Sequence, residues 1–154
     1  GKGEQFAPEF VAINPNSSFS RFSCGAALFA DARPEDGAAQ LQLFIRRSPK
    51  DPYVGFAYYF LALCYLSLND PQQAEQAARK SVKHSPGFAW GDVVLAMSLM
   101  HLGRDAEAQQ QIQKVRQLEP GMTCQSVEDI WRHMLRHQEQ AEAMIALTRQ
   151  AWRD

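Results

Sequence analysis

The sequence lacks both an excess of charge and a long hydrophobic run, and these absences limit its partners. Its 16 lysine and arginine residues nearly balance 17 aspartate and glutamate residues, and no basic stripe recurs, so we expect no nucleic-acid partner. The longest almost wholly apolar stretch, Phe56 to Leu68, is too short to span a bilayer, which needs roughly 20 residues. We therefore expect no membrane insertion, and the first residues give no sign of a signal peptide.

The sequence also has few motifs that are typical of catalytic, metal-binding or phosphate-binding sites. Its three cysteines form no C-x-x-C pair, and we expect Cys24 and Cys64 to be packed thiols inside helices, in a chain suited to the reducing cytoplasm. His133 and His137 lack the glutamate of an H-E-x-x-H zinc site, so we place them on a solvated helix face. No glycine-rich phosphate loop exists. We expect no catalytic residue, no metal and no cofactor, and conclude that the chain is not an enzyme.

What the sequence does contain is a repeat. Pro15, Pro49, Pro86 and Pro120 each close a stretch of helical character, and they divide the chain into steps of 34, 37 and 34 residues. A period of this length predicts a stacked array of helix pairs, and such arrays usually provide a binding surface rather than a catalytic pocket. No segment alternates with period two, so we expect an all-α fold without a sheet.

Small residues recur between the prolines at matching places. They form pairs twelve residues apart, Gly25 with Gly37, Ala62 with Ala74 and Ala96 with Ala108. Two helices can cross closely where neither offers a large side chain. Residues 18–120 thereby resemble tetratricopeptide repeats, whose signature is this small pair, an aromatic residue such as Tyr65 and a closing proline. Phe44, Ser81 and Val115 depart from the alanine usual in the family.

The resemblance implies a right-handed helical-repeat solenoid in one domain. Its expected parts are a partial outer helix of a preceding repeat in residues 1–17, three repeats in 18–51, 52–88 and 89–122, and two capping helices in 123–154. Each repeat should hold an inner and an outer helix, with Asp70 capping the outer helix of the second repeat and Gly103 ending the inner helix of the third. Ser126 should cap the first C-terminal helix, and Glu139 to Trp152 should form the second. These last helices should close the exposed end of the solenoid. We also expect the chain to be the C-terminal part of a longer protein.

A narrower resemblance points to a bacterial context. Ser48 to Pro52, Tyr58 to Tyr65 and Leu102 to Ala108 resemble motifs in the C-terminal repeat region of bacterial class III adenylate or guanylate cyclases and of related winged-helix regulators. In such proteins the repeats are an accessory segment that senses or docks. The cyclase resemblance implies a signalling role for this chain.

The resemblance also implies a partner-binding groove on the concave face, lined by positions 2, 5, 9 and 12 of each first helix. These are Phe19, Phe22, Ala26 and Phe29; Phe56, Tyr59, Leu63 and Leu66; and Trp90, Val93, Met97 and Met100. They form an apolar trough without the lysine, arginine and asparagine of the family's carboxylate-binding members. We expect Phe22, Tyr59, Trp90 and Val93 to be more exposed than Leu61 and Leu95 on the packed side.

A trough this apolar should be covered, because soluble proteins seldom expose so large a patch. Three kinds of cover would serve: the chain's own terminal helices, a second copy of the chain, or an apolar helix of a partner. We expect a protein–protein interaction module that binds a protein or peptide helix, or a second copy as a homodimer. The alternative is a structural dimerisation element or a secretion-type chaperone that shelters an apolar helix, and an upstream catalytic or DNA-binding domain would separate the two.

Overall fold

The structure is a computed structural model that describes residues 18–153. Within this range all regular structure is helical, as the repeat pattern predicts. The elements are α3 (Ser18–Ala30), α4 (Pro34–Arg47), α5 (Val54–Ser67), α6 (Pro71–His84), α7 (Ala89–His101), α8 (Asp105–Leu118), α9 (Cys124–Met134) and α10 (Gln138–Ala151). The outer helix predicted in residues 1–17 lies outside the described residues. No helix of the described part is both long and apolar enough to cross a membrane.

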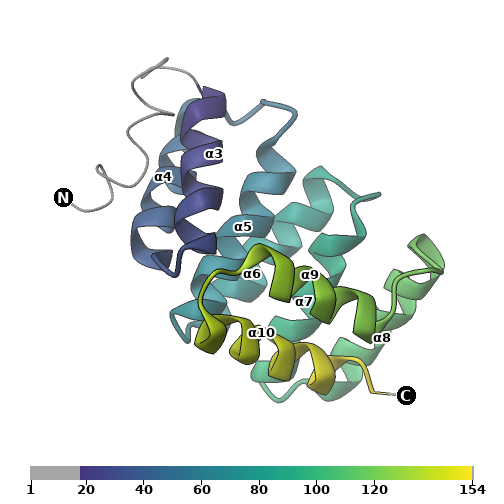
Figure 1. Cartoon of the computed structure of the whole chain (residues 1–154). Helices are drawn as coiled ribbons and strands as arrows, with labels where there is room; N and C mark the ends of the chain where they lie inside the picture. Colours follow the sequence, from purple (N-terminus) through teal and green to yellow (C-terminus); the bar gives the residue numbers. More distant parts are fainter. Residues whose placement is uncertain (1–17, 154) are drawn as a thin grey trace.

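The first six of these helices form three stacked pairs (Figure 1). Each pair, α3 with α4, α5 with α6 and α7 with α8, packs along its length, and α4 and α6 each pack on the first helix of the next pair. In addition α3 packs on α5, and α5 packs on α7. The first helices therefore line a common inner face of the solenoid, which we call the concave face.

Small residues allow the helices of a pair to approach closely, as predicted. A Cβ atom added to Gly25 would lie 2.6 Å from Leu41 Cγ, and one added to Gly37 would lie 2.9 Å from the Gly25 carbonyl oxygen. Ala62 and Ala96 are completely buried. Larger side chains at these crossings would overpack the interface and push the helices apart.

The turn inside each repeat has one conformation in three different sequences. Ala32, Asn69 and Gly103 all have positive φ, at 58°, 58° and 76°. In the first repeat the N–H of the following residue donates to the Leu28 carbonyl at 2.9 Å, and the equivalent bonds to Tyr65 and Leu99 have the same length. This left-handed turn satisfies helix-end carbonyls that would otherwise lack a donor. Only Gly103 reveals it in the sequence.

Ser81 of α6 is buried at a position where the repeat family usually has alanine, between the first turns of α5 and α7. Ser81 Oγ, fully enclosed, donates to the Gly55 carbonyl oxygen at 2.8 Å. A Cβ atom on Gly55 would lie 1.9 Å from Ser85 Oγ, and one on Gly91 would lie 2.9 Å from Ser81 Oγ. The first turns of α5 and α7 therefore press against the C-terminal part of α6, where a satisfied hydroxyl and glycines fit together.

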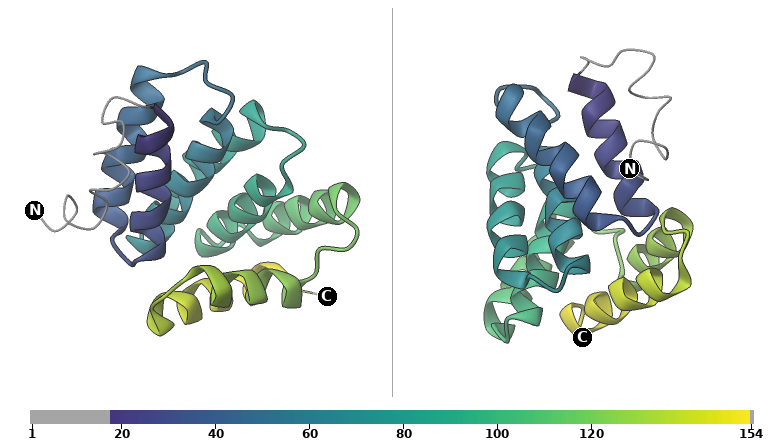
Figure 2. Two further views of the ribbon diagram at one scale, coloured as in Figure 1. Left: turned by 45° about the horizontal axis from the view of Figure 1, so that its top comes forward. Right: turned by 90° about the vertical axis from the view of Figure 1, so that its left-hand side faces the viewer.

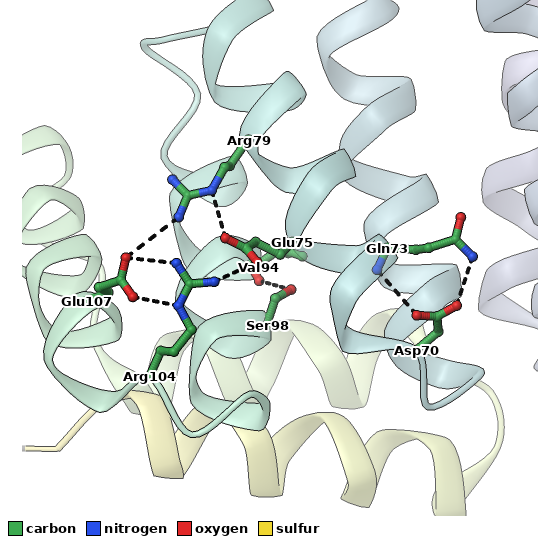
Figure 3. A network of polar contacts seen from close by, with 8 residues as sticks. All are labelled: Asp70, Gln73, Glu75, Arg79, Val94, Ser98, Arg104 and Glu107. Atoms are coloured by element: carbon green, nitrogen blue, oxygen red, sulfur yellow. Dashed lines mark hydrogen bonds and ion pairs between the residues drawn. The ribbon is translucent and has the colours of Figure 1, made fainter.

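Ion pairs join the outer helices of the second and third repeats (Figure 3). Arg104, which precedes α8, binds Glu75 of α6 at 2.8 Å and also binds Glu107. Arg79 binds Glu75 at 2.9 Å. The same view shows the predicted N-cap of α6, where Asp70 Oδ1 accepts from the Gln73 N–H at 3.3 Å. Because Arg79, Arg104 and Glu107 are each nearly half exposed, the network adds little to stability.

The last two helices depart from the prediction. They form a hairpin in which α10 packs on α9 and α7 more than on α8, so it folds back across the concave face instead of simply closing the end (Figure 2). The apolar face of α10, with Met144, Ile145 and Ala151, is buried in this position. The N-cap of α9 is Thr123, with Ser126 at the third helical position of a capping box.

Candidate partner-binding groove

The α9–α10 hairpin packs on α7 and reaches the C-terminal ends of α3 and α5, where Leu66 and Met144 border a cavity of about 370 Å³. Five predicted groove residues lie in the C-terminal halves of these three helices with at most 7% exposure, and we call them the covered half: Phe29, Leu63, Leu66, Met97 and Met100. Thr148 Oγ1 of α10 lies 3.9 Å from Met97 Sδ. Trp131 of α9 is completely buried and donates from Nε1 to Thr148 Oγ1 at 2.8 Å. The chain's own hairpin is thus one cover of the trough.

Polar contacts at the turn of the hairpin attach it to the first repeat. Gln140 Nε2 donates to the Phe29 carbonyl oxygen at 2.8 Å, and the Arg136 N–H donates to the Ala30 carbonyl oxygen at 3.4 Å. His137 Nε2 lies 3.3 Å from Asp31 Oδ1. His137 is therefore not on the helix that carries His133, because α9 ends at Met134, and it is paired rather than simply solvated as predicted.

A second set of ion pairs braces the hairpin internally. Glu128 of α9 is 4% exposed, and its Oε1 lies 2.7 Å from an Arg149 nitrogen and 3.3 Å from an Arg132 nitrogen. The Cys124 thiol donates to Glu128 Oε2 at 3.3 Å. The hydrogen bond from Arg149 is the main cause that lowers the pKa of Glu128. The hairpin is thus held as a unit.

The N-terminal halves of the same helices remain open and border a cavity of about 310 Å³. We call it the aromatic groove. Its lining is entirely aromatic or aliphatic: Phe22, Tyr53, Phe56, Tyr59, Phe60, Phe88, Trp90, Ile130 and Met134. The last two belong to α9, so the hairpin that covers one half of the concave face also forms a wall of the open half.

Ring contacts fix the aromatic side chains in place. Phe22 stacks on Tyr53 with centroids 5.5 Å apart, and Phe56 meets Phe88 edge to face at 4.7 Å. Trp90 meets the buried Trp131 at 5.6 Å. Such pairs each contribute about 0.5–1.5 kcal/mol beyond the area they bury. The groove is therefore built from aromatic side chains that pack on one another.

Large apolar side chains extend to the rim of the groove. Phe19, Tyr53 and Ile130 are 55%, 42% and 38% exposed. Phe19 lies beside the lining, with its ring centroid 5.6 Å from that of Tyr53. Exposed hydrophobic residues that adjoin an apolar cavity mark an interaction surface more often than scattered ones do.

Four of the groove residues predicted from the sequence line the aromatic groove in the structure, namely Phe22, Phe56, Tyr59 and Trp90. Phe22 and Trp90 are more exposed than Leu61 and Leu95, as predicted. The exposure predicted for Tyr59 and Val93 is wrong. Tyr59 is 4% exposed beneath its aromatic neighbours, against 6% for Leu61, and Val93 is 0% exposed, against 2% for Leu95, so neither is more exposed than the packed-side leucine of its own helix.

Five lining residues were missed, each for a definite reason. Tyr53 and Phe88 precede their helices, at the N-cap positions of α5 and α7, and so fall outside a helical position count. Phe60 follows Tyr59 and was not counted among the groove positions. Ile130 and Met134 belong to the hairpin, outside the three repeats from which the groove positions were counted. Only the turn of the hairpin brings them to the groove.

Tyr59 is the one deeply buried polar side chain of the lining. Its ring packs edge to face on Phe60 and Phe88, with centroids 4.9 Å and 5.2 Å away. Burial raises the pKa of the Tyr59 phenol, so the hydroxyl keeps its proton at physiological pH. Within residues 18–153 that hydroxyl is not one of the enclosed polar atoms that lack a hydrogen-bond partner.

The cysteines are placed much as predicted. Cys24 and Cys64 are buried in first helices, and burial raises the pKa of both thiols, that of Cys64 to about 12. Such thiols are poor nucleophiles. Among the described residues no group of three or more histidine, cysteine, aspartate or glutamate side chains is arranged to hold a metal ion.

Comparisons with known proteins agree with this architecture. The family profile of the tetratricopeptide repeat matches residues 57–87, which comprise most of α5 and all of α6. Among solved structures, the chain is similar to the crystal structure of MamA, with a TM-score of 0.67 and 17% sequence identity over 94% of this chain and 82% of that chain. No curated protein matches the sequence significantly.

The fold is therefore a helical solenoid of the tetratricopeptide-repeat type. Proteins with this repeat are typically non-enzymatic scaffolds, which agrees with the expectation that the chain is not an enzyme. The similarities lend no support to the expected relation with cyclases or winged-helix regulators.

Proposed function

We propose that this chain is a protein–protein interaction module that binds an apolar segment of a partner through the aromatic groove. The observation that carries the proposal is the lining itself, nine aromatic or aliphatic side chains around about 310 Å³ of open space. Rigid aromatic residues in a preformed pocket are the kind that dominate binding energy at protein interfaces. The match to tetratricopeptide repeats supports the same class of function.

The size of the groove limits what it receives. A volume of about 310 Å³ is at the lower end of the range for ligand pockets, which begins near 300 Å³. It holds one or two large side chains rather than a whole helix. The partner therefore binds by inserting apolar anchor residues at the N-terminal ends of the first helices, while its remaining surface rests on the exposed rim of Phe19, Tyr53 and Ile130.

The experiment uses the full chain and two alanine variants. Phe22→Ala removes a half-buried ring from the groove, and Tyr58→Ala removes a half-buried ring that stacks on His84 with centroids 5.6 Å apart, outside the groove lining. Proteins captured by the wild type and by Tyr58→Ala, but not by Phe22→Ala, are identified by mass spectrometry. Each candidate is then purified and its dissociation constant measured by calorimetry.

We expect Phe22→Ala to weaken binding about 30-fold, as truncation of an interface anchor does, and Tyr58→Ala to leave it unchanged. Equal losses in both variants would place the binding surface elsewhere. Light scattering tests the homodimer on the same samples. A dimer that Phe22→Ala converts to a monomer would make the partner a second copy of the chain.

A narrower proposal rests on the sequence motifs alone. The segments 48–52, 58–65 and 102–108 favour an accessory role in a bacterial signalling protein, in which the groove receives a segment of a regulatory partner. The coding sequence upstream of residue 1 tests this directly. A catalytic cyclase domain or a winged-helix domain there would support it, and an initiation codon immediately upstream would contradict it.

A further inference from the structure

Positively charged side chains without an acidic partner gather in one part of the surface. Several lysine and arginine residues pair with a carboxylate, as Arg79 and Arg149 do. Among residues 18–153, five exposed cations form no ion pair, and we call them the basic patch: Arg46, Arg47, Lys50, Lys80 and Lys83. All five lie in the C-terminal parts of α4 and α6 or in the loop that follows α4.

Contacts of Tyr58 bring the two helices of this patch together. Tyr58 of α5 borders a cavity of about 240 Å³, which is lined by Gln42, Ile45, Arg46, Tyr58 and Leu61. Lys80 Nζ lies over the Tyr58 ring, 5.5 Å from its centroid, and His84 stacks on the same ring at 5.6 Å. Arg46 of α4 and Lys80 of α6 are therefore placed beside the same small cavity.

The fold itself accounts for only part of this arrangement. A cation in the last turn of a helix interacts favourably with the helix dipole, which explains Arg47 of α4 and Lys83 of α6. It does not explain Lys80, which precedes the last turn of α6. Asp51 is the one carboxylate in residues 44–51 and 78–85, and it accepts a hydrogen bond from the Tyr53 N–H at 2.8 Å. The patch thus keeps a positive charge that attracts an anionic partner.

The cavity decides which kind of anion fits. At about 240 Å³ it is smaller than ligand pockets usually are, so it holds one side chain of a larger partner. Ile45, Tyr58 and Leu61 give it apolar walls, and the Arg46 guanidinium can bind a carboxylate with two N–H groups. The ring contacts of Tyr58 use the surface on which a nucleic-acid base would stack. These features favour a protein segment over a nucleic acid.

We propose that the basic patch is a second binding surface, which receives an acidic segment of a partner protein that carries one large apolar side chain. That side chain enters the cavity beside Tyr58, and carboxylates on either side of it bind Arg46 and Lys80. None of these residues lines the aromatic groove, so the inference goes beyond the proposed function and does not depend on it.

Two double variants of the full chain test the patch. The patch variant combines Arg46→Gln with Lys80→Gln, and the control variant combines Arg132→Gln with Arg153→Gln, which removes the same charge from exposed sites elsewhere. The probes are the peptides acetyl-EDDFEDE-amide and acetyl-EDDSEDE-amide, which differ only in the central residue. Dissociation constants come from NMR titrations that follow the methyl signals of Ile45, which lines the cavity.

We expect the patch variant to bind the phenylalanine peptide about tenfold more weakly than the wild type, because two ion pairs are lost. The control variant should differ from the wild type by less than about twofold, and so should Phe22→Ala, which alters the aromatic groove. The serine peptide should bind the wild type at least about fivefold more weakly than the phenylalanine peptide, because it buries no large apolar side chain. Added salt should weaken binding of both peptides.

Four results would overturn the inference. If the phenylalanine peptide leaves the Ile45 signal unchanged, the cavity is not its site. Equal losses in the two double variants would mean attraction by net charge alone, and equal binding of the two peptides would exclude the apolar anchor. Tighter binding of oligothymidylate or of phosphatidylserine vesicles through Arg46 and Lys80 would assign the patch to a nucleic acid or a membrane surface instead. None of these results would affect the aromatic groove, which Phe22→Ala tests separately.

Discussion

On the concave face, α10 packs on α7 and donates a hydrogen bond to the C-terminal end of α3, whereas the N-terminal halves of the first helices border the aromatic groove. Both halves are apolar, and both use equivalent positions of successive repeats. The covered half contains Met97 and Leu63 at 0% exposure, while the open half leaves Phe22 and Trp90 only half-buried. The difference comes from where the hairpin lies, so the repeat pattern supplies the apolar surface and the hairpin decides which part of it can receive a partner.

The largest expected effect comes from two tryptophans that touch across this boundary. Trp131 is completely buried, whereas Trp90, with its centroid 5.6 Å away, is half-buried in the open groove. We expect Trp131→Ala to lower the free energy of unfolding by about 3–5 kcal/mol, because it leaves a large cavity and removes the partner of Thr148. Urea denaturation measures this loss.

Trp90→Ala is the matched variant, and it should cost at least about 1 kcal/mol less because its ring is already partly in solvent. It should weaken binding of a groove partner more than it weakens the fold. Equal losses of stability in the two variants would show that the open half is as structural as the covered half.

Asp92, which also belongs to α7, tests how a buried charge affects the stability of the fold. Its carboxylate is fully buried, and Lys114 Nζ lies 3.2 Å from Oδ1. Burial raises the pKa of Asp92, and the ion pair with Lys114 only partly opposes this. We expect Asp92→Asn to raise the free energy of unfolding at pH 7 by about 1–2 kcal/mol.

The pH dependence of this effect has a definite sign. Because the pKa of Asp92 is higher in the folded chain than in the unfolded chain, folding binds a proton between the two values. This group therefore makes the wild type lose stability as the pH rises from about 4 through the raised pKa. Asp92→Asn should remove that contribution in urea titrations across the interval. A variant that is less stable at pH 7 would show that the ion pair outweighs burial.

The smallest effects concern the turn that attaches the hairpin to the first repeat. Gln140→Ala removes a partly buried hydrogen bond to the Phe29 carbonyl and should cost about 1 kcal/mol. His137→Ala removes an exposed pair with Asp31 and should cost less than about 0.5 kcal/mol. Hydrogen exchange of α10 amides measures both. If His137→Ala had the larger effect, the pair with Asp31 rather than the amide would hold the hairpin.

Much of the repeat could be predicted because its signals are local. Ala62 and Ala96 at helix crossings and the Asp70 cap follow from side-chain size and from hydrogen bonding within one turn. The left-handed turn at Ala32 could not be predicted, because alanine gives no sign of positive φ. The stacking of neighbouring helices imposes that conformation on whichever residue stands there.

The sequence by itself determined an all-helical solenoid with an apolar inner face, because period, proline spacing and small residues act over one or two helices. Only the tertiary structure decided how that face is used. The hairpin buries Met97 and brings Ile130 and Met134 beside aromatic residues of the first two repeats. Its contacts with Phe29 and Ala30 join residues more than 100 positions apart, where no local pattern can specify a pairing, and the gain in buried apolar area selects the arrangement.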